Sequence, residues 1–335
     1  MRIRSVLSRM SSSAAPRAVL AVVAAFALLG LAPLEINPES ARIAPDLPLA
    51  DLHFHPQPAI SPAMAREWMD RNGVRWIGGG VKAWKLEVLP LGRAMWTTYA
   101  LDLGERFIPI GGMTELNVAY RKGGVAAMED AGDPEIAALL HRSDEDLSAG
   151  RIKAIGTIFI NNSRSHTMPA FRRKAHGDAS SVRRLYTLVA EHGAVLVVHM
   201  HPDADTLAQF EPLMAADRRA RVMWSQCGTD ATASQLRRML DRHPNLFCEL
   251  SWRYPPITTP DLKSRYIFDA TGPTEEWRTL IEDHPDRFMI GNDGETPDQY
   301  DAAIAMVRKG LLPYLKPETA RMVAYKNAVR EFNLK

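Results

Sequence analysis

Cysteine is almost absent from the sequence, which limits the kinds of protein that it can encode. Only Cys227 and Cys248 occur among 335 residues. A small domain stapled by several disulfides is excluded, because such scaffolds need many cysteines in a short chain. We expect the two cysteines to lie on neighbouring strands as buried packing thiols rather than as part of a disulfide framework.

A stripe of positive charge is also missing. The formal net charge is +2, but Arg2, Arg4, Arg9 and Arg17 stand in a leader without acids, and the remaining chain has 37 basic against 39 acidic residues. Without a basic stripe carrying interleaved aromatics, the electrostatic footprint of a nucleic-acid-binding protein is lacking. We therefore predict a small-molecule substrate and no nucleic-acid partner, and a homo-oligomer stays open.

The sequence has one long apolar run, and this run is short for a membrane span. Residues 18–32, AVLAVVAAFALLGLA, form a 15-residue run after a basic, serine-containing segment. A transmembrane helix needs about 20 apolar residues, whereas this length suits the core of a secretory signal. Residues 1–44 are predicted to be a signal peptide or signal anchor plus linker, with cleavage after Ala32 or Ala44. We expect export to the periplasm or the extracellular space, with an uncleaved membrane anchor as the alternative.

Apolar runs alternate with longer amphipathic segments along the rest of the chain, a pattern typical of βα units and a parallel sheet. Eight strands are predicted, at 49–55, 74–80, 107–113, 152–160, 194–200, 221–228, 246–251 and 288–293. This number matches a (β/α)8 TIM-like barrel better than a doubly wound sheet, so a single barrel domain is expected over 45–335. No GxGxxG motif follows the first strand, which argues against a dinucleotide cofactor.

Two His-x-His triplets stand at the ends of predicted strands. Ten histidines give about 0.3 such triplets by chance, yet HFH at 53–55 and HMH at 199–201 both occur. Alternate residues of a strand share a face, so His53 and His55 are expected to point together into the barrel mouth, where barrel enzymes have their active sites. Two imidazoles there can bind one metal ion. Solvated strand ends are the alternative.

Asp293 closes the last predicted strand, in the sequence IGND. When a barrel closes, its last strand lies beside its first. This carboxylate is therefore predicted to face His53 and His55. An Asx turn or a helix N-cap is its alternative role.

Four motifs, three at strand ends and one near the C-terminus, form a recognisable series. They are DLHFH at 51–55, VLVVHM at 195–200, IGND at 290–293 and YKNAVREF at 325–332. Together they resemble the amidohydrolase superfamily, in its amidohydrolase-related branch of metal-dependent hydrolases and decarboxylases, over about residues 49–333. The resemblance implies a distorted (β/α)8 barrel with one divalent ion, often zinc. The sequence does not choose between zinc and manganese. It implies His53, His55 and His199 as ligands, with Asp293 as a further ligand or the general base.

Two positions depart from that family's pattern. The sixth strand of the relatives commonly ends in a histidine, whereas WSQCG puts Gln226 there. Glutamine makes hydrogen bonds but does not carry a proton near neutral pH. Relatives with two metal ions use a modified lysine or a glutamate near the end of the fourth strand, whereas Lys153 lies at its beginning. A site for one metal ion is therefore expected.

Loops after the strands supply the predicted substrate contacts. Arg253, between two aromatics in WRY, is a predicted fork for a carboxylate, and Gln226 is a predicted hydrogen-bonding partner. Arg164, His166 and Trp84 are further predicted contacts. Solvated or packing roles are the alternative for each of them.

His201 and Glu249 are two more polar residues at the ends of predicted strands. His201 is predicted to replace the missing histidine of the sixth strand as a catalytic acid or base, with an ordinary surface role as the alternative. Glu249 is expected to make a polar contact in the core, because a buried carboxylate must be paired or protonated.

These features together predict an exported hydrolase with one metal ion, which activates water to cleave a small ester, lactone or amide. A non-oxidative decarboxylase of the same branch is the nearest alternative. A catalytically inactive barrel that serves as a binding or scaffold protein in the cell envelope is the rival from another class.

Overall fold

The structure is a computed structural model that describes residues 34–81, 91–164, 172–257, 263 and 265–335. The predicted leader and the predicted substrate contacts Trp84 and His166 lie outside the described residues. Helix α2 (Pro38–Ile43) belongs to the same unit as the barrel, which clusters from Ile36 to Lys335. The folded unit thus begins before the predicted domain start at residue 45.

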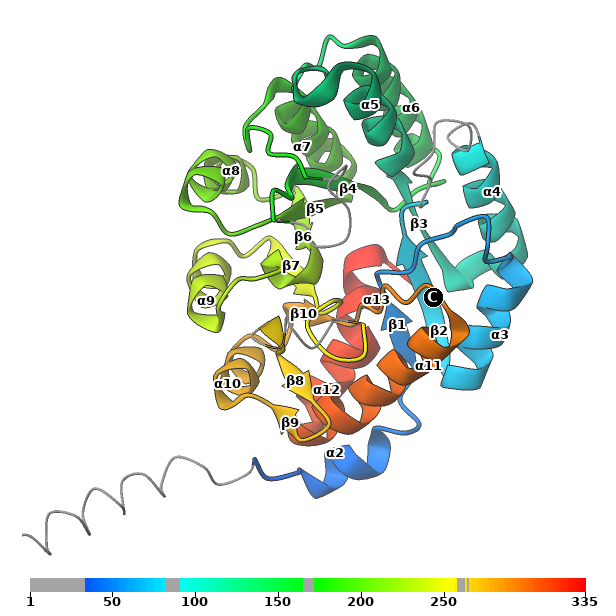
Figure 1. The fold of residues 1–335 in the computed structure, drawn as a ribbon, viewed down its shortest axis with the longest axis vertical. Helices are drawn as coiled ribbons and strands as arrows, with labels where there is room; N and C mark the ends of the chain where they lie inside the picture. Colours follow the sequence, from blue (N-terminus) through cyan, green and yellow to red (C-terminus); the bar gives the residue numbers. More distant parts are fainter. Residues whose placement is uncertain (1–33, 82–90, 165–171, 258–262, 264) are drawn as a thin grey trace, which may run out of the picture. The chain divides into compact units, whose positions relative to one another are not determined.

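Eight parallel strands form the barrel. They are β1 (Leu49–Asp51), β2 (Val74–Gly79), β3 (Phe107–Gly112), β4 (Ala154–Asn161), β5 (Val195–Met200), β6 (Arg221–Trp224), β7 (Leu246–Glu249) and β10 (Phe288–Met289). Each strand pairs with the next one in this order, and a parallel bridge between Asp51 and Ile290 joins the last strand to the first. The predicted (β/α)8 barrel is confirmed (Figure 1).

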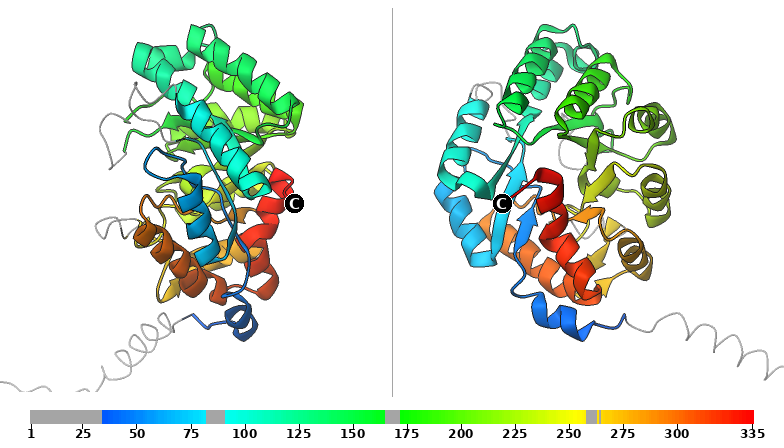
Figure 2. Two further views of the ribbon diagram at one scale, coloured as in Figure 1. Left: turned by 90° about the vertical axis from the view of Figure 1, so that its right-hand side faces the viewer. Right: turned by 180° about the vertical axis from the view of Figure 1, so that it is seen from behind.

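Helices lie around the outside of the barrel, and the last of them lies across one end (Figure 2). They are α3 (Pro62–Asn72), α4 (Leu91–Leu103), α5 (Met113–Glu129), α6 (Pro134–Ser148), α7 (Ser180–His192), α8 (Ala204–Ala216), α9 (Ala233–Arg242), α10 (Glu275–Asp283), α11 (Pro297–Met306), α12 (Pro317–Arg321) and α13 (Asn327–Phe332). Their ends follow local sequence signals: Thr232 and Gln235 form a capping box at α9, and Gly193 ends α7 in a left-handed conformation. A short antiparallel pair, β8 (Phe268–Asp269) and β9 (Gly272–Pro273), lies between β7 and α10.

The barrel interior is filled with apolar side chains and is closed at one end. Val197 of β5 belongs to the interior cluster, and so does Phe332 of α13. Arg221, the first residue of β6, donates a hydrogen bond to the carbonyl of Glu331, so α13 covers the amino ends of the strands. Because side chains alternate along β5, His199 shares the face of Val197 and lies near the opposite, carboxyl end.

Several strands end earlier than predicted, which changes the setting of the predicted ligands. Because β1 ends at Asp51 and β10 at Met289, His53, His55 and Asp293 lie in the segments that follow these strands. The two segments nevertheless stay side by side, since the N–H of Asp293 donates to the carbonyl of His53 at 2.8 Å.

Cys227 and Cys248 form a disulfide bond, so the prediction of two packing thiols is wrong. After β6 the chain makes a 3₁₀ turn at Ser225–Gly228, which brings Cys227 beside β7 with 5.0 Å between the two cysteine Cα atoms. Trp224 is the β6 residue paired with Cys248. A strand continuing through 228, as predicted, would have carried Cys227 about 10 Å beyond that pair.

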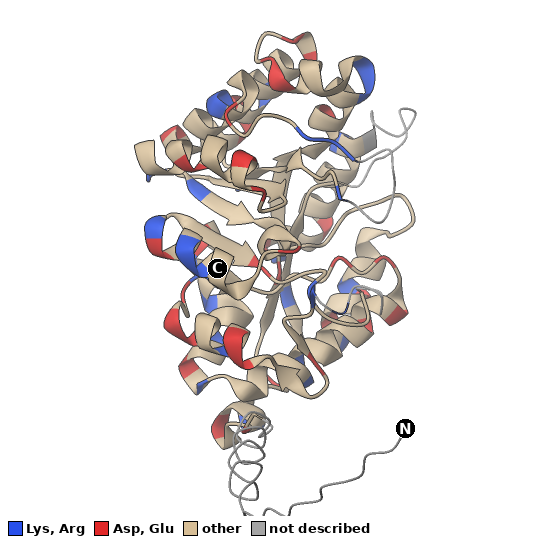
Figure 3. Cartoon of the chain, turned by 60° about the vertical axis from the view of Figure 1, so that its left-hand side comes forward, with Lys and Arg blue, Asp and Glu red and all other residues tan. Residues whose placement is uncertain are grey.

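The outer surface carries both signs of charge. Lysine and arginine are intermixed with aspartate and glutamate over the helices in Figure 3, and many of them pair, as Arg71 does with Asp301 at 2.9 Å. Among the described residues, no helix has both the length and the apolar character needed to cross a membrane.

Candidate metal centre

His53, His55 and Asp293 come together at the carboxyl end of the barrel. Each offers a ligand atom, and these atoms all lie within 4.8 Å of one another. Nε2 of His53 is 3.8 Å from Oδ2 of Asp293, and Nε2 of His55 is 3.6 Å from Oδ1. The two imidazole rings stand at 90° with their centroids 4.8 Å apart. Two ring nitrogens thus approach one carboxylate from two directions.

Each of these histidines is held through its other ring nitrogen. Nδ1 of His53 lies 2.8 Å from Oε1 of Glu249 and 3.0 Å from the hydroxyl of Ser251, and Nδ1 of His55 lies 2.7 Å from the carbonyl oxygen of Gly80. Because carbonyl and carboxylate oxygens accept hydrogen bonds, we assign the ring proton to Nδ1 in both residues. Nε2 of each ring then faces Asp293, as in histidines that bind metal ions.

Buried Asp51 connects the two segments that carry these candidate ligands. Its Oδ1 accepts hydrogen bonds from the N–H of His53 at 3.0 Å and from the N–H of Asn292 at 2.9 Å. Burial raises the pKa of this carboxyl to about 7, against the opposing effect of the two hydrogen bonds. The aspartate of DLHFH therefore fixes the backbone on both sides of the centre.

Glu249 is fully buried, and its carboxylate is surrounded by donors. Besides His53, Oε1 accepts from the N–H of Gln226 at 2.6 Å, and Oε2 accepts from the N–H of Ser251 at 2.7 Å. Gly291 passes so close that a Cβ there would lie 1.9 Å from Oε2. The predicted polar contact of Glu249 is confirmed, but the sequence did not identify His53 as its partner. The signal for a buried partner was the position of this carboxylate within an otherwise apolar predicted strand.

The charges around His53 favour a cation. Burial disfavours its protonated form, but the negative charges of Glu249 and Asp293, with the hydrogen bond to Glu249, outweigh burial and raise its pKa to about 9. A metal ion is attracted to the same position for the same reason, and it would displace the proton.

His199 lies near this group without belonging to it. Its Nε2 is 3.3 Å from the hydroxyl of Thr229, and its ring packs on Phe159 with 5.1 Å between centroids. Burial, followed by the charges of His201 and His53, lowers the pKa of His199 to about 3. The ring is therefore neutral, as a metal ligand must be. Three of the four predicted ligands come together, and the fourth lies beside them.

His201 and Arg164 belong to one network of charged side chains. The His201 side chain is fully buried, with Nδ1 3.0 Å from Asp230 and with Nε2 lacking a hydrogen-bond partner within the described part of the chain. Arg164 donates to Asp230 at 3.0 Å and also to Asp203. The predicted substrate contact Arg164 is thus already paired with two aspartates. The ring of His201 lies 6.1 Å from that of His199.

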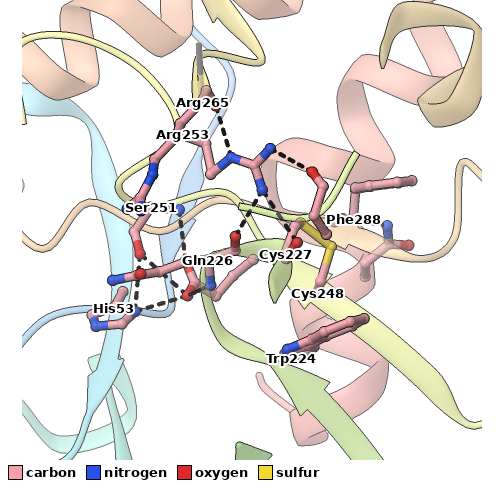
Figure 4. The surroundings of a disulfide bond; sticks show 12 residues. His53, Trp224, Gln226, Cys227, Cys248, Ser251, Arg253, Arg265 and Phe288 are labelled. Atoms are coloured by element: carbon pink, nitrogen blue, oxygen red, sulfur yellow. Dashed lines mark hydrogen bonds and ion pairs between the residues drawn. A yellow bond between two sulfur atoms is a disulfide. The ribbon is translucent and has the colours of Figure 1, made fainter. Parts of the chain in front are cut away.

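Gln226 and Arg253, two further predicted substrate contacts, support the turn after β6 (Figure 4). The side-chain oxygen of Gln226 accepts from the hydroxyl of Thr229 at 3.2 Å. Arg253 is only 2% exposed. Its guanidinium donates to four backbone carbonyls, those of Arg265, Gln226, Cys227 and Ala231. These bonds engage the fork that was predicted to bind a carboxylate, so we do not include Arg253 among the proposed substrate contacts.

Comparison with known proteins identifies the fold. No protein-family model matches the chain, and no curated protein matches its sequence. An uncharacterised TIM-barrel protein from Bordetella bronchiseptica has a similar structure, with a TM-score of 0.55 and 15% identity over 86% of this chain and 99% of that one. A 4-oxalomesaconate hydratase from Rhodopseudomonas palustris is also similar, with a TM-score of 0.54 and 12% identity over 85% of this chain and 95% of the hydratase chain. An amidohydrolase structure matches with a TM-score of 0.50 and 11% identity over 85% of this chain and 99% of the amidohydrolase chain.

At these low identities the likeness establishes the fold and nothing finer. The chain is a (β/α)8 barrel with two histidines and an aspartate gathered at the carboxyl ends of its strands. Its barrel is similar to those of an amidohydrolase and a hydratase along nearly the whole length of both. This fold agrees with the one that the resemblance of DLHFH and IGND to the amidohydrolase superfamily implied.

Proposed function

We propose that the chain is a metal-dependent enzyme of the amidohydrolase type, which hydrolyses a small ester, lactone or amide. The observation that carries the proposal is the approach of two Nε2 atoms to Asp293 while both opposite ring nitrogens are fixed by hydrogen bonds. Solvated strand-end histidines would not be held in this way. The position at the carboxyl ends of barrel strands, where barrel enzymes have their active sites, supports the same conclusion.

The donor set fits one divalent ion. Two imidazole nitrogens and a carboxylate are typical ligands of catalytic zinc, and manganese also accepts such donors. Ligand atoms about 2.0–2.1 Å from a tetrahedral zinc ion lie roughly 3.3 Å apart. Here Nε2 of His53 lies 3.8 Å from Oδ2 of Asp293, and Nε2 of His55 lies 3.6 Å from Oδ1. His199, neutral and adjacent, is the fourth residue that would hold the ion.

Two chemical roles can be given to the residues of the centre. A divalent ion at this position would polarise a substrate carbonyl and lower the pKa of a water molecule. Asp293 would accept a proton from the attacking water and deliver it to the leaving group. Glu249 keeps the ring of His53 in the orientation that this arrangement needs.

A second acid or base, where the reaction uses one, is a residue other than Gln226, because an amide does not transfer protons near neutral pH. His201 is the candidate, since its ring is buried, hydrogen-bonded to Asp230 on one side and close to His199. This resembles the pairing of a catalytic histidine with an orienting carboxylate.

The test begins with metal analysis of the purified full-length chain. About one equivalent of zinc or manganese is expected, and it should be lost in the double variant His53→Ala/His55→Ala. The double variant His141→Ala/His192→Ala is a matched control, because these two histidines lie on the outer helices α6 and α7. It should retain the metal.

Activity is then measured on a panel of esters, lactones and amides, with Asp293→Asn as the test variant. Loss of turnover with retained folding is expected. Aromatic carboxylates are included because the resemblance covers decarboxylases, and release of CO₂ would replace the hydrolase by that alternative. A folded protein that binds no metal and turns over nothing when zinc is added would favour a scaffold.

Export is part of the same proposal. Disulfides persist mainly in oxidising compartments, and the Cys227–Cys248 bond supports a location outside the cytoplasm. When the full chain is expressed in a bacterium with two membranes, the protein should be recovered in the periplasm or medium with a new N-terminus between residues 32 and 45, or bound to the membrane with its N-terminus intact. Recovery from the cytoplasm with all residues retained would refute export.

A further inference from the structure

The turn that follows β6 has an unusual backbone. Gln226, Cys227, Gly228 and Thr229 have φ values of 57°, 43°, 77° and 63°, so four consecutive residues lie in the region of positive φ. Only glycine adopts this region without a penalty from its side chain. Three of these residues carry a Cβ, and contacts from outside the turn must therefore hold it in this shape.

Two contacts hold the turn from outside. The disulfide joins Cys227 to Cys248 of β7. The buried guanidinium of Arg253 donates from Nη1 to the carbonyls of Gln226 and Cys227, at 3.3 and 3.2 Å. This guanidinium also lies 4.9 Å from the ring centroid of Trp277. In Figure 4 the disulfide and Arg253 meet the turn on the side away from His53.

Each end of the turn contacts a residue that adjoins the candidate metal centre. At one end the N–H of Gln226 donates to Glu249 at 2.6 Å, and Glu249 holds Nδ1 of His53 at 2.8 Å. At the other end the hydroxyl of Thr229 lies 3.3 Å from Nε2 of His199. Cys227 follows the donor Gln226 directly, and Cys248 directly precedes the acceptor Glu249. The disulfide therefore links the residue next to the donor of this hydrogen bond to the residue next to its acceptor.

We propose that the Cys227–Cys248 disulfide is a positioning element of the metal centre, so that reduction of this bond weakens metal binding. The inference rests on the proposed function, because it requires that His53 be a ligand. Without the bond, the turn is free to leave the region of positive φ, and Glu249 loses a fixed donor. Its carboxylate then no longer holds the His53 ring in one orientation. Loss of an outer partner of a ligand typically lowers metal affinity by about 10- to 100-fold.

The experiment measures the dissociation constant of Zn²⁺ by competition with a chromophoric chelator, before and after treatment with a water-soluble trialkylphosphine. The phosphine cleaves the S–S bond with one water molecule, giving two thiols and the phosphine oxide. The variant Cys227→Ser/Cys248→Ser is the matched control. It lacks both the bond and the new thiols, which could themselves bind zinc, and it shows any direct effect of the phosphine. Far-UV circular dichroism reports on folding, and the visible spectrum of the Co²⁺-loaded protein reports on ligand geometry.

The expected result is a zinc affinity at least 10-fold weaker in the reduced protein and in the serine variant, with a changed Co²⁺ spectrum and unchanged circular dichroism. The phosphine should not weaken the serine variant further. Zinc affinities within 2-fold of the oxidised protein, with an unchanged Co²⁺ spectrum, would overturn the inference. Loss of circular dichroism in step with metal loss would also overturn it, since the bond would then hold the whole fold. If the oxidised protein binds no zinc, the proposed function itself fails.

Discussion

Replacement of Glu249 by glutamine tests how the protein orients a ligand of the proposed metal centre. The carboxylate accepts hydrogen bonds on both oxygens, from His53 and Gln226 on Oε1 and from the N–H of Ser251 on Oε2. Glutamine has one acceptor oxygen and one donor amide group. In either orientation the new NH₂ group must face an N–H donor, so one side of the site is left without an acceptor.

The magnitude follows from these contacts. The bond to His53 changes from charge-assisted to neutral, and charge-assisted bonds are roughly twice as strong. Loss of such a partner typically lowers metal affinity by about 10- to 100-fold, which corresponds to about 1.4 to 2.8 kcal/mol. The donor left unsatisfied in the core should lower the free energy of unfolding of the metal-free protein by about 1 to 3 kcal/mol.

The assay combines zinc competition with urea unfolding, and Glu282→Gln is the matched control. Glu282 is also largely buried and accepts from the N–H of Lys316 at 2.6 Å and from the hydroxyl of Thr319 at 2.9 Å. Its variant should lose stability but keep its zinc affinity. If the zinc affinity of Glu249→Gln is within about 2-fold of the wild-type affinity, Glu249 does not support zinc binding through His53, and the reasoning is refuted.

Three further variants probe the surroundings of the centre. Gly291→Ala places a Cβ 1.9 Å from Oε2 of Glu249, so we expect at least about 10-fold weaker zinc binding and a lower melting temperature. His199→Ala should weaken zinc binding by more than about 100-fold if His199 is a ligand. Burial favours the neutral form of Asp230, but hydrogen bonds from His201 and an arginine outweigh it and hold its pKa below the usual range. Asp230→Asn should therefore lower the melting temperature at pH 7, and this difference should shrink steadily as the pH falls below about 4 toward the depressed pKa of the folded protein.

Each of these expectations has an outcome that contradicts it. An unchanged zinc affinity in Gly291→Ala would show that the carboxylate has room to move, and Gly132→Ala, at a loop glycine, controls for the general effect of an added methyl. An unchanged affinity in His199→Ala would limit the ligands to the three residues that already lie together. For Asp230, a depressed pKa stabilises the fold above the pKa of the unfolded chain, and this stabilisation is lost as the pH falls toward the pKa of the folded state. A melting difference that is as large at about pH 2 as at pH 7 would therefore contradict the assignment.

The sequence by itself determined the barrel and most of the candidate metal centre. Eight apolar runs separated by amphipathic segments specify eight strands. A strand that is buried on both faces appears in the sequence as a continuous apolar run, whereas an amphipathic helix shows apolar residues with the helical period. A closed barrel then places the end of the last strand beside the first, which is why Asp293 was predicted to face His53 and His55. Short-range pattern and topology were sufficient for these statements.

Only the tertiary structure decided how these ligands are held. The disulfide, the buried Arg253 and the Gln226–Glu249 hydrogen bond all depend on the positive-φ turn after β6, where the alternation expected of 221–228 stops. Strand periodicity carries no information about such a turn, because residues with a Cβ adopt it only when distant groups stabilise it. Which donors surround Glu249, and that its partner is His53, followed from packing between segments some 200 residues apart.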